Sequence, residues 1–201
     1  MNKSISLINA DSDPINLFNS WFKEASISEI NDPNAMNLST ISKDLKPSSR
    51  MVLLKDFSLN GFIFYTNLNS KKSESIIKNP NVALNFHWKS LLRQVRIEGK
   101  AKKVLDDEAD EYYESRAENS KISAWASNQS RELTSREELE IKIKYYKKEF
   151  ENKKIKRPSF WSGYRVEPDL IEFWHDMPFR LHDRLEYKKI NNVWISKKLY
   201  P

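Results

Sequence analysis

The stretch that decides the fold is VALNFHWKSLLRQVRIEGKAKKV (82–104), which holds two strand patterns separated by a short polar break. In its RQVRIEG segment (93–99), valine, isoleucine and glycine alternate with glutamine, arginine and glutamate. Successive side chains of a strand point to opposite faces, so this pattern predicts one packed face and one polar face. We expect the two strands to pair and to offer the polar face to solvent or a ligand.

More strand patterns lie on both sides of this pair. Upstream they cover 35–41, 50–55 and 62–66, with a polar turn at 43–47 and an Asn60-Gly61 turn, and this spacing predicts two adjacent hairpins. Downstream of Pro158 they cover 161–166, 170–175, 180–187 and 192–199, the last two joined at Asn191-Asn192. Because tight turns rather than helices connect the strands, we predict a mainly β fold with attached α-helices, an antiparallel sheet closed into a barrel.

Helix signals occupy the rest of the chain. Asp13 followed by Pro14 predicts the start of an amphipathic helix, and Ser70 is expected to cap a short helix that ends at Lys78. Residues 106–129 indicate two helical pieces, and the capping box Thr134-x-x-Glu137 predicts a further helix to about residue 150.

The chain shows neither internal repeats nor a linker rich in Gly, Ser or Pro. We therefore predict a single domain over 1–201, with an N-terminal helix segment (1–30), a helical insertion (106–157) and C-terminal strands (158–201).

Composition narrows the chemistry. The 201 residues carry 34 Lys and Arg against 28 Asp and Glu, a net charge of +6 that favours anionic partners. The absence of cysteine excludes disulfides, thiolate metal sites and a cysteine nucleophile, and three scattered histidines make a metal site unexpected. With only three glycines, far apart, a glycine-rich phosphate loop is excluded. A bound phosphate must therefore be held mostly by side chains.

Location and macromolecular partners are also constrained. The apolar runs are too short to span a membrane, and the first residues lack the apolar stretch of a secretion signal. We expect a cytoplasmic protein without a membrane partner. The basic run 142–157 sits beside acids of the same helix, so we interpret it as a solvated face and expect no nucleic-acid partner.

Several cations lie within strand patterns rather than on surface helices. Arg50 and Lys55 bracket four apolar residues, and RLHDR (180–184) holds two arginines around a histidine. A guanidinium beside a half-buried strand needs an anion, which is either a ligand or an internal carboxylate. Alternation along a strand would place Arg180, His182 and Arg184 on one face, an accumulation of positive charge that an anionic or electron-rich ligand would relieve.

From about residue 13 to the end, the chain resembles the pyridoxine/pyridoxamine 5′-phosphate oxidase family. The motifs that carry the resemblance, all in the same order, are DP (13–14) with WF (21–22), NAM (34–36), RMVLLK (50–55), GFIFYTN (61–67), RQVRIEG (93–99), AWAS (124–127) with QS (129–130), IEFW (171–174) and RLHDR (180–184).

The resemblance implies an FMN-binding split β-barrel that forms a homodimer with FMN at the subunit interface. It implies oxidation of pyridoxamine 5′-phosphate and pyridoxine 5′-phosphate to pyridoxal 5′-phosphate, the last step of vitamin B6 cofactor synthesis or salvage. In the family mechanism a hydride passes from the substrate C4′ to flavin N5, and O2 then reoxidises the flavin and gives H2O2.

Residue roles follow from the same resemblance. Arg180 and His182 are implied as catalytic residues that face the substrate ring. The implied substrate-binding residues are Lys55, Tyr112, Arg116, Ser120, Arg180 and His182. The implied FMN-binding residues are Arg50, Met51, Val52, Leu53, Leu54, Lys55, Tyr65, Thr66, Lys71, Lys72, Gln94, Gln129, Ser130, Trp174 and Arg184. The trio at 112, 116 and 120 steps by four, as one side of a helical turn and its exit would.

This chain departs from the family pattern at positions that include 71 and 162. It has Lys71 where the family often has arginine, which replaces a bidentate fork by a point charge, and Ser162 where glycine is usual. The alternative to an oxidase is a non-catalytic split-barrel protein that binds FMN or pyridoxal phosphate. The substrate-phosphate set together with RLHDR favours the oxidase, because a carrier needs neither.

Overall fold

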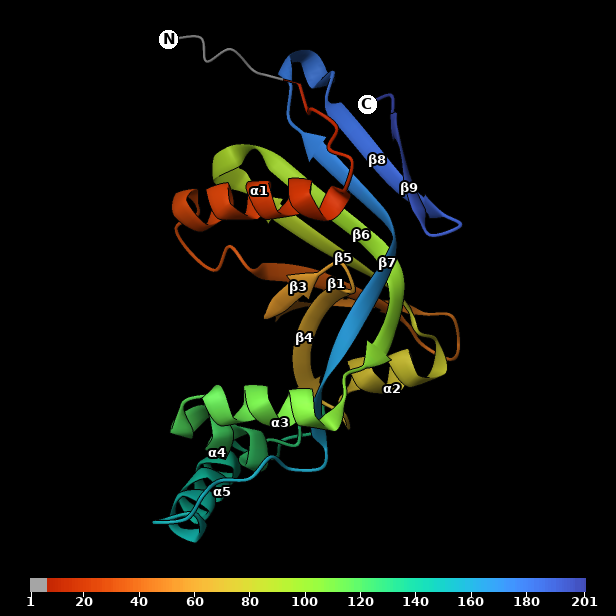
Figure 1. The fold of residues 1–201 in the computed structure, drawn as a ribbon. Helices are drawn as coiled ribbons and strands as arrows, with labels where there is room; N and C mark the ends of the chain where they lie inside the picture. The colour runs from red at the N-terminus through yellow and green to blue at the C-terminus, as the bar shows by residue number, and fades with distance from the viewer. Residues whose placement is uncertain (1–6) are drawn as a thin grey trace.

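The computed structural model describes residues 7–201 and is built on one antiparallel sheet of nine strands (Figure 1). Residues 1–6, part of the stretch read above for a secretion signal, lie outside the described residues. The strands are β1 (Ala35–Ile41), β2 (Pro47–Leu53), β3 (Asp56–Ser58), β4 (Gly61–Asn67), β5 (Asn81–Trp88), β6 (Arg93–Lys103), β7 (Trp161–His175), β8 (Asp183–Ile190) and β9 (Val193–Lys198).

The order of the strands makes a curled half-barrel. The main path runs β2-β1-β5-β6-β7-β4-β3, and β8 pairs with the second half of β7 and with β9. Every pairing is antiparallel. The predicted mainly β, antiparallel split-barrel architecture is therefore confirmed.

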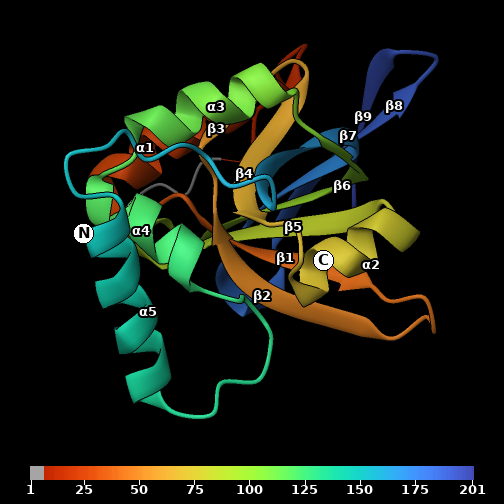
Figure 2. The ribbon, with the colours of Figure 1, turned by 90° about the horizontal axis from the view of Figure 1, so that it is seen from below.

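In the described part of the chain, five α-helices accompany the sheet: α1 (Pro14–Ser28), α2 (Lys71–Lys78), α3 (Asp106–Ser115), α4 (Glu118–Ala126) and α5 (Arg136–Glu149). Figure 1 shows α3, α4 and α5 gathered at one end of the molecule and the β8–β9 hairpin at the other. Figure 2 shows α2 and α5 at separate flanks of the sheet. Among residues 7–201 no helix has the length and apolar character that a bilayer crossing requires.

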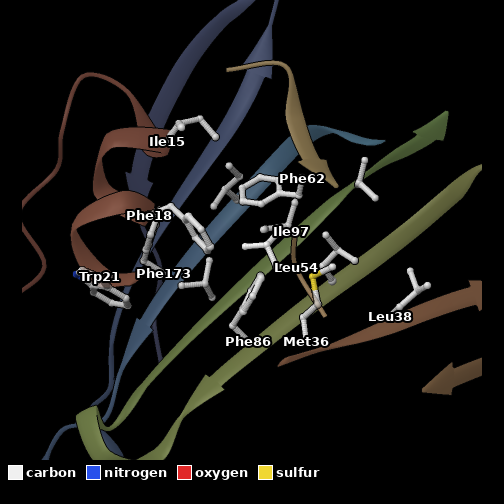
Figure 3. Packing of buried hydrophobic residues seen from close by; sticks show 14 of the residues in the cluster. Ile15, Phe18, Trp21, Met36, Leu38, Leu54, Phe62, Phe86, Ile97 and Phe173 are labelled. Atoms are coloured by element: carbon white, nitrogen blue, oxygen red, sulfur yellow. The ribbon is translucent and has the colours of Figure 1, made fainter. Parts of the chain in front are cut away.

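The inner face of the sheet forms the core together with α1 (Figure 3). Ile97 of β6 lies opposite Leu84 of β5 and Ile171 of β7, and all three are fully buried. The α1 residue Phe18 is also fully buried, and Trp21 packs edge-on against Phe173 of β7. The alternation in 93–99 thus predicts correctly which residues face the core, and it leaves the polar set on the outer face.

Local signals place the helix starts well. The Asp13 carboxylate accepts a hydrogen bond of 2.8 Å from the backbone N–H of Ile15, as expected of an N-cap. The capping box before α5 is shifted by one residue from the prediction, because Ser135 rather than Thr134 is the N-cap and accepts from the N–H of Glu138.

The second predicted hairpin is wrong. The chain forms a short extra strand, β3, before the Asn60-Gly61 turn, so β4 pairs with β3 and β7 and not with the strand that contains Arg50. Gly61 has a φ of +124°, and a Cβ there would lie 2.2 Å from the carbonyl oxygen of Val166. Only glycine fits this turn, and it lets β4 come close to β7.

Two strand boundaries also differ from the prediction. The patterns at 161–166 and 170–175 are halves of one 15-residue strand, β7, which continues past Pro168 where the register with β6 shifts. The strand predicted over 180–187 begins at Asp183, because 178–180 forms a 3₁₀ turn in which Phe179 and Arg180 have positive φ. This second difference changes the geometry of the candidate site.

Candidate functional site

One group of the predicted site residues surrounds a pocket between β4, the end of α3 and α4. The pocket, of about 260 Å³, is hereafter the β4–α3 pocket. The predicted residues that line it are Lys55, Tyr65, Thr66, Tyr112, Arg116 and Gln129. Five residues that were not among the predicted site residues also line it: Asn67, Ser123, Ala124, Ser127 and Trp161. Ser120 lies in the first turn of α4 and is not among the lining residues.

Three parallel aromatic rings form one wall of the β4–α3 pocket. The Tyr65 and Tyr112 rings are 4.0 Å apart between centroids, and the Tyr65 and Trp161 rings are 5.3 Å apart, with interplanar angles of 13° and 7°. Burial raises the pKa of the Tyr65 phenol to about 12, so it remains a neutral hydrogen-bonding group. Trp161 was missed because a tryptophan at the start of a strand is indistinguishable by sequence from a core residue.

Arg116 ends this wall with a half-buried cation. Helix α3 stops at Ser115 and Arg116 takes an extended conformation, so the trio at 112, 116 and 120 is divided between two helices instead of sharing one. The guanidinium carbon lies 4.7 Å from the Trp161 ring centroid, and Nη1 is buried with no hydrogen-bond partner. Burial lowers the pKa of Arg116. A buried N–H without an acceptor is costly, so this nitrogen suits an anionic ligand.

A second buried cation, Lys72, lies beside the same pocket. Its side chain is 7% exposed, and Nζ donates to Thr66 Oγ1 at 3.0 Å, Ser70 Oγ at 3.1 Å and Gln129 Oε1 at 3.0 Å. Burial, with a smaller contribution from the charge of Arg50, lowers the Lys72 pKa to about 8. Within residues 7–201 no carboxylate forms an ion pair with this ammonium group.

Arg50 completes this cationic corner. Its guanidinium donates to Leu38 O, Thr40 Oγ1 and Ser48 Oγ at 2.8 to 3.1 Å, and none of these acceptors carries a charge. Burial lowers the pKa of Arg50. Two cations held only by neutral oxygens have the donor chemistry of a phosphate site, and their charge is uncompensated by any described acid.

The remaining predicted residues of the first group are less enclosed. Met51 and Leu53 point to the outer face, with 61% and 38% of their surfaces exposed, whereas Leu54 is buried and Val52 is half-buried. Lys71 is exposed in the first turn of α2. Ser130 is exposed in the loop after α4 and has a φ of +70°.

A second group of predicted residues forms a row across the outer face at the other end of the sheet. The register places Gln94 of β6 opposite Trp174 of β7, and Trp174 opposite Arg184 of β8. The Arg184 guanidinium donates from Nε to Glu172 Oε1 at 2.8 Å and from Nη1 to Tyr200 O at 2.9 Å. We call Gln94, Trp174 and Arg184 the outer row.

His182 lies against this row but not between two guanidiniums. Its ring centroid is 4.6 Å from that of Trp174, and Nδ1 is 2.9 Å from Asp176 Oδ1. The predicted alternation of Arg180, His182 and Arg184 on one face is wrong, because β8 begins after His182 and Arg180 is exposed in the preceding turn. The neighbours of Nδ1 are the Asp176 carboxylate and the backbone N–H of Met177, at 3.3 Å, rather than a guanidinium.

The two groups are far apart within one chain. Trp161 in the β4–α3 pocket and Trp174 in the outer row are 13 residues apart on β7, which corresponds to roughly 40 Å along an extended strand. No small ligand touches both ends of such a strand. If the predicted residues form one site, a second copy of the chain must bring them together.

A larger groove lies between α4 and the end of α5 and contains none of the predicted site residues. Its volume is about 890 Å³, and solvent-exposed lysines and glutamates line it. Several of these lysines pair with acids nearby, as in the Lys153–Glu149 and Lys154–Glu114 pairs, so the groove has the character of a solvated surface.

Comparison with known proteins defines the class first. The structure superimposes on that of PhzG from Burkholderia lata, bound there to tetrahydrophenazine-1-carboxylic acid, with a TM-score of 0.91 and 30% identity over 96% of this chain and 95% of that one. The fold is therefore that of a split β-barrel.

Sequence comparison then gives the family. Residues 22–149 match the family model of pyridoxamine 5′-phosphate oxidase, and residues 161–201 match that of the pyridoxine 5′-phosphate oxidase C-terminal dimerisation region. The chain is 53% identical to pyridoxine/pyridoxamine 5′-phosphate oxidase from Bartonella henselae over 94% of its own length and 92% of that protein. It is 50% identical to the enzyme of that name from Caulobacter vibrioides over 96% and 86%. The chain belongs to the pyridoxine/pyridoxamine 5′-phosphate oxidase family.

The dimerisation match bears directly on the divided site. It covers β7, β8 and β9, which carry Trp174, His182 and Arg184, so it supports a homodimer. Two residues of the outer row, Trp174 and Arg184, therefore lie within the region of the chain that is associated with subunit contact.

Proposed function

We propose that the protein is an FMN-dependent oxidase that converts pyridoxamine 5′-phosphate and pyridoxine 5′-phosphate to pyridoxal 5′-phosphate. The observation that carries the proposal is the pair of partly buried cationic positions, at Lys72 with Arg50 and at Arg116, beside the β4–α3 pocket. Both positions lack an acidic partner among residues 7–201, and family membership supplies two phosphorylated ligands for them. The bound flavin would accept the hydride from the substrate and transfer the electrons to O2.

The Lys72 corner is proposed to hold the FMN phosphate. A phosphate there would receive charge-assisted hydrogen bonds from Lys72 and Arg50, which now donate to hydroxyl, amide and carbonyl oxygens. Thr66 and Gln129 already bond to each other and to Lys72, so they are positioned to contact the same ligand. This arrangement replaces the glycine-rich loop that the sequence excludes.

The Arg116 position is proposed to hold the substrate phosphate, together with Lys55 and Tyr112. Stacking on Trp161 fixes the guanidinium plane, which lowers the entropy lost when it binds an anion. Binding of the substrate phosphate by these residues would orient the substrate, and the residues would take no part in the reaction itself.

The outer row and the residues near it would complete the site from a second copy of the chain. Trp174 and Arg184 are proposed to contact the flavin, and Arg180 and His182 to face the substrate ring. This arrangement follows from the separation of roughly 40 Å along β7, because one protomer cannot place both groups on one ligand.

The decisive experiment begins with the visible spectrum of the purified protein, in which bound flavin absorbs and fluoresces. Anaerobic mixing with pyridoxamine 5′-phosphate should then bleach the flavin, and admission of O2 should restore it with formation of H2O2. A protein that binds flavin but keeps its absorbance unchanged would be the carrier that the sequence left as an alternative. Pyridoxamine without its phosphate is the matched control and should react far more weakly.

A further inference from the structure

Glu172, for which the sequence predicted no role, is a buried acid in the middle of the outer face of the sheet. It lies on β7 two residues before Trp174, and its side chain is only 3% exposed. Its Oε1 accepts from Arg184 Nε at 2.8 Å, and its Oε2 pairs with Arg96 Nη1 at 3.1 Å. Each carboxylate oxygen is thus held by a different guanidinium, one from β6 and one from β8.

The charged side chains near this carboxylate also form ion pairs. Arg96 also pairs with Glu98 at 3.1 Å, and Glu186, opposite Glu172 in the register, pairs with Lys197 at 3.0 Å. The hydrogen bond to Glu172 raises the pKa of Arg184. Arg184 therefore has a fixed acidic partner, whereas the cations at the β4–α3 pocket have none.

The contacts of Arg184 leave one nitrogen for a ligand. Nε is engaged by Glu172 and Nη1 by Tyr200 O, and no described residue accepts a hydrogen bond from Nη2. Because the guanidinium is planar, two fixed nitrogens define the direction of the third. A buried ion pair contributes little to stability compared with apolar packing, so orientation of Arg184 is the effect to expect from Glu172.

We propose that Glu172 is a positioning residue for the flavin site: its carboxylate, anchored on the other side by Arg96, fixes Arg184 so that Nη2 faces the ligand beside Trp174 and Gln94. Glu172 itself does not touch the ligand. The inference rests on the proposed function, because it takes the outer row as part of the flavin site.

The test is a double-mutant cycle on the affinity of the full-length protein for FMN, measured by quenching of flavin fluorescence. Glu172→Gln should raise the Kd roughly 10- to 100-fold, because an amide offers Arg184 a weaker and partly mismatched partner. In an Arg184→Ala background the same substitution should change the Kd by less than about twofold, because the residue through which Glu172 acts is gone.

The chain offers a matched control. Glu98→Gln also removes a carboxylate from Arg96, but Glu98 is half-exposed and does not contact Arg184. It should leave the Kd within about twofold of the original. Thermal unfolding of each flavin-free variant separates a loss of folding from a loss of orientation.

Arg184→Lys keeps the test informative if Glu172→Gln fails to fold. Lysine keeps the charge but cannot bond Glu172, Tyr200 O and a ligand in one plane, so it should bind FMN about as weakly as Arg184→Ala. The inference is overturned if Arg184→Lys binds normally, if folded Glu172→Gln binds normally, or if Glu172→Gln costs as much without Arg184 as with it. Failure of the unsubstituted protein to bind FMN would instead overturn the proposed function, and the inference with it.

Discussion

Replacing Lys72 by methionine should have opposite effects on folding and on flavin binding. Lys72 is 7% exposed, and its ammonium group bonds only to neutral oxygens and has its pKa lowered from 10.5 to about 8. At about 1.4 kcal/mol for each pH unit, holding the charge in the flavin-free fold costs about 3 kcal/mol at neutral pH. Methionine has a similar shape and removes this cost, although it also gives up the hydrogen bonds of Nζ.

We therefore expect Lys72→Met to stabilise the flavin-free protein by about 1–3 kcal/mol, which for a chain of this size raises the Tm by roughly 2 to 10 °C. The same change should weaken FMN binding roughly 10- to 100-fold, because a charge-assisted hydrogen bond to the phosphate is lost. Calorimetry of the flavin-free protein and fluorescence titration with FMN measure the two effects.

The stability difference between Lys72→Met and the original protein should depend on pH. Because the folded pKa lies below the unfolded one, the cost of Lys72 is complete below pH 8 and disappears as the pH rises toward 10.5. The stability advantage of methionine should shrink over that window. Lys78→Met, at an exposed lysine of the same helix, should change stability by no more than a few tenths of a kcal/mol. A lower Tm for Lys72→Met would contradict the cost assigned to the buried charge, and an unchanged affinity for FMN would contradict the role of Lys72 in phosphate binding.

Three further predictions concern the ligands. Arg116→Lys should raise the KM for pyridoxamine 5′-phosphate roughly 10- to 100-fold while FMN stays bound, because lysine loses the stack on Trp161 and the bidentate fork. Steady-state kinetics measure this KM, and an unchanged value would contradict the prediction. The Kd for FMN should be flat between about pH 6.5 and 8 and then rise by up to about tenfold per pH unit as Lys72 loses its proton, and a titration series should find this rise absent in Lys72→Met. Arg180→Ala and His182→Ala should each lower turnover by at least about 100-fold with flavin retained, and normal turnover in both would reject their catalytic roles.

Alternation and capping signals predicted most of the fold because they depend on neighbouring residues alone. The alternation in 93–99 identified both faces of β6, and Asp13 marked the start of α1. The strand order could not be obtained in this way. Nothing local distinguishes β4 pairing with β7, about 100 residues later, from β4 pairing with β2. The close approach at Gly61 that permits the distant pairing is a tertiary property.

The residues of the candidate site were predicted mainly from the resemblance to the family. The resemblance to the family implied roles for Lys72, Arg116 and the outer row, but it did not identify the partners that give these residues their properties. Trp161 stacks on Arg116 from another part of the chain, and Glu172 holds Arg184 across two strands. The expectation that Arg180, His182 and Arg184 alternate along one strand face failed, because the chain makes a 3₁₀ turn with positive φ values at 178–180. Such a turn is set by the loop as a whole rather than by alternation.

The central claim is that each site takes the β4–α3 pocket from one protomer and the outer row with His182 from the other. The most direct measurement is the activity of hybrid dimers made by co-expressing two differently tagged inactive variants, Arg116→Ala and His182→Ala. Shared sites give every hybrid one intact site and one doubly substituted site, so a random mixture should recover about a quarter of the original activity, carried entirely by dimers that bear both tags. If all the residues acted within one chain, each site of the hybrid would keep one lesion, and a mixture as inactive as its parents would contradict the claim.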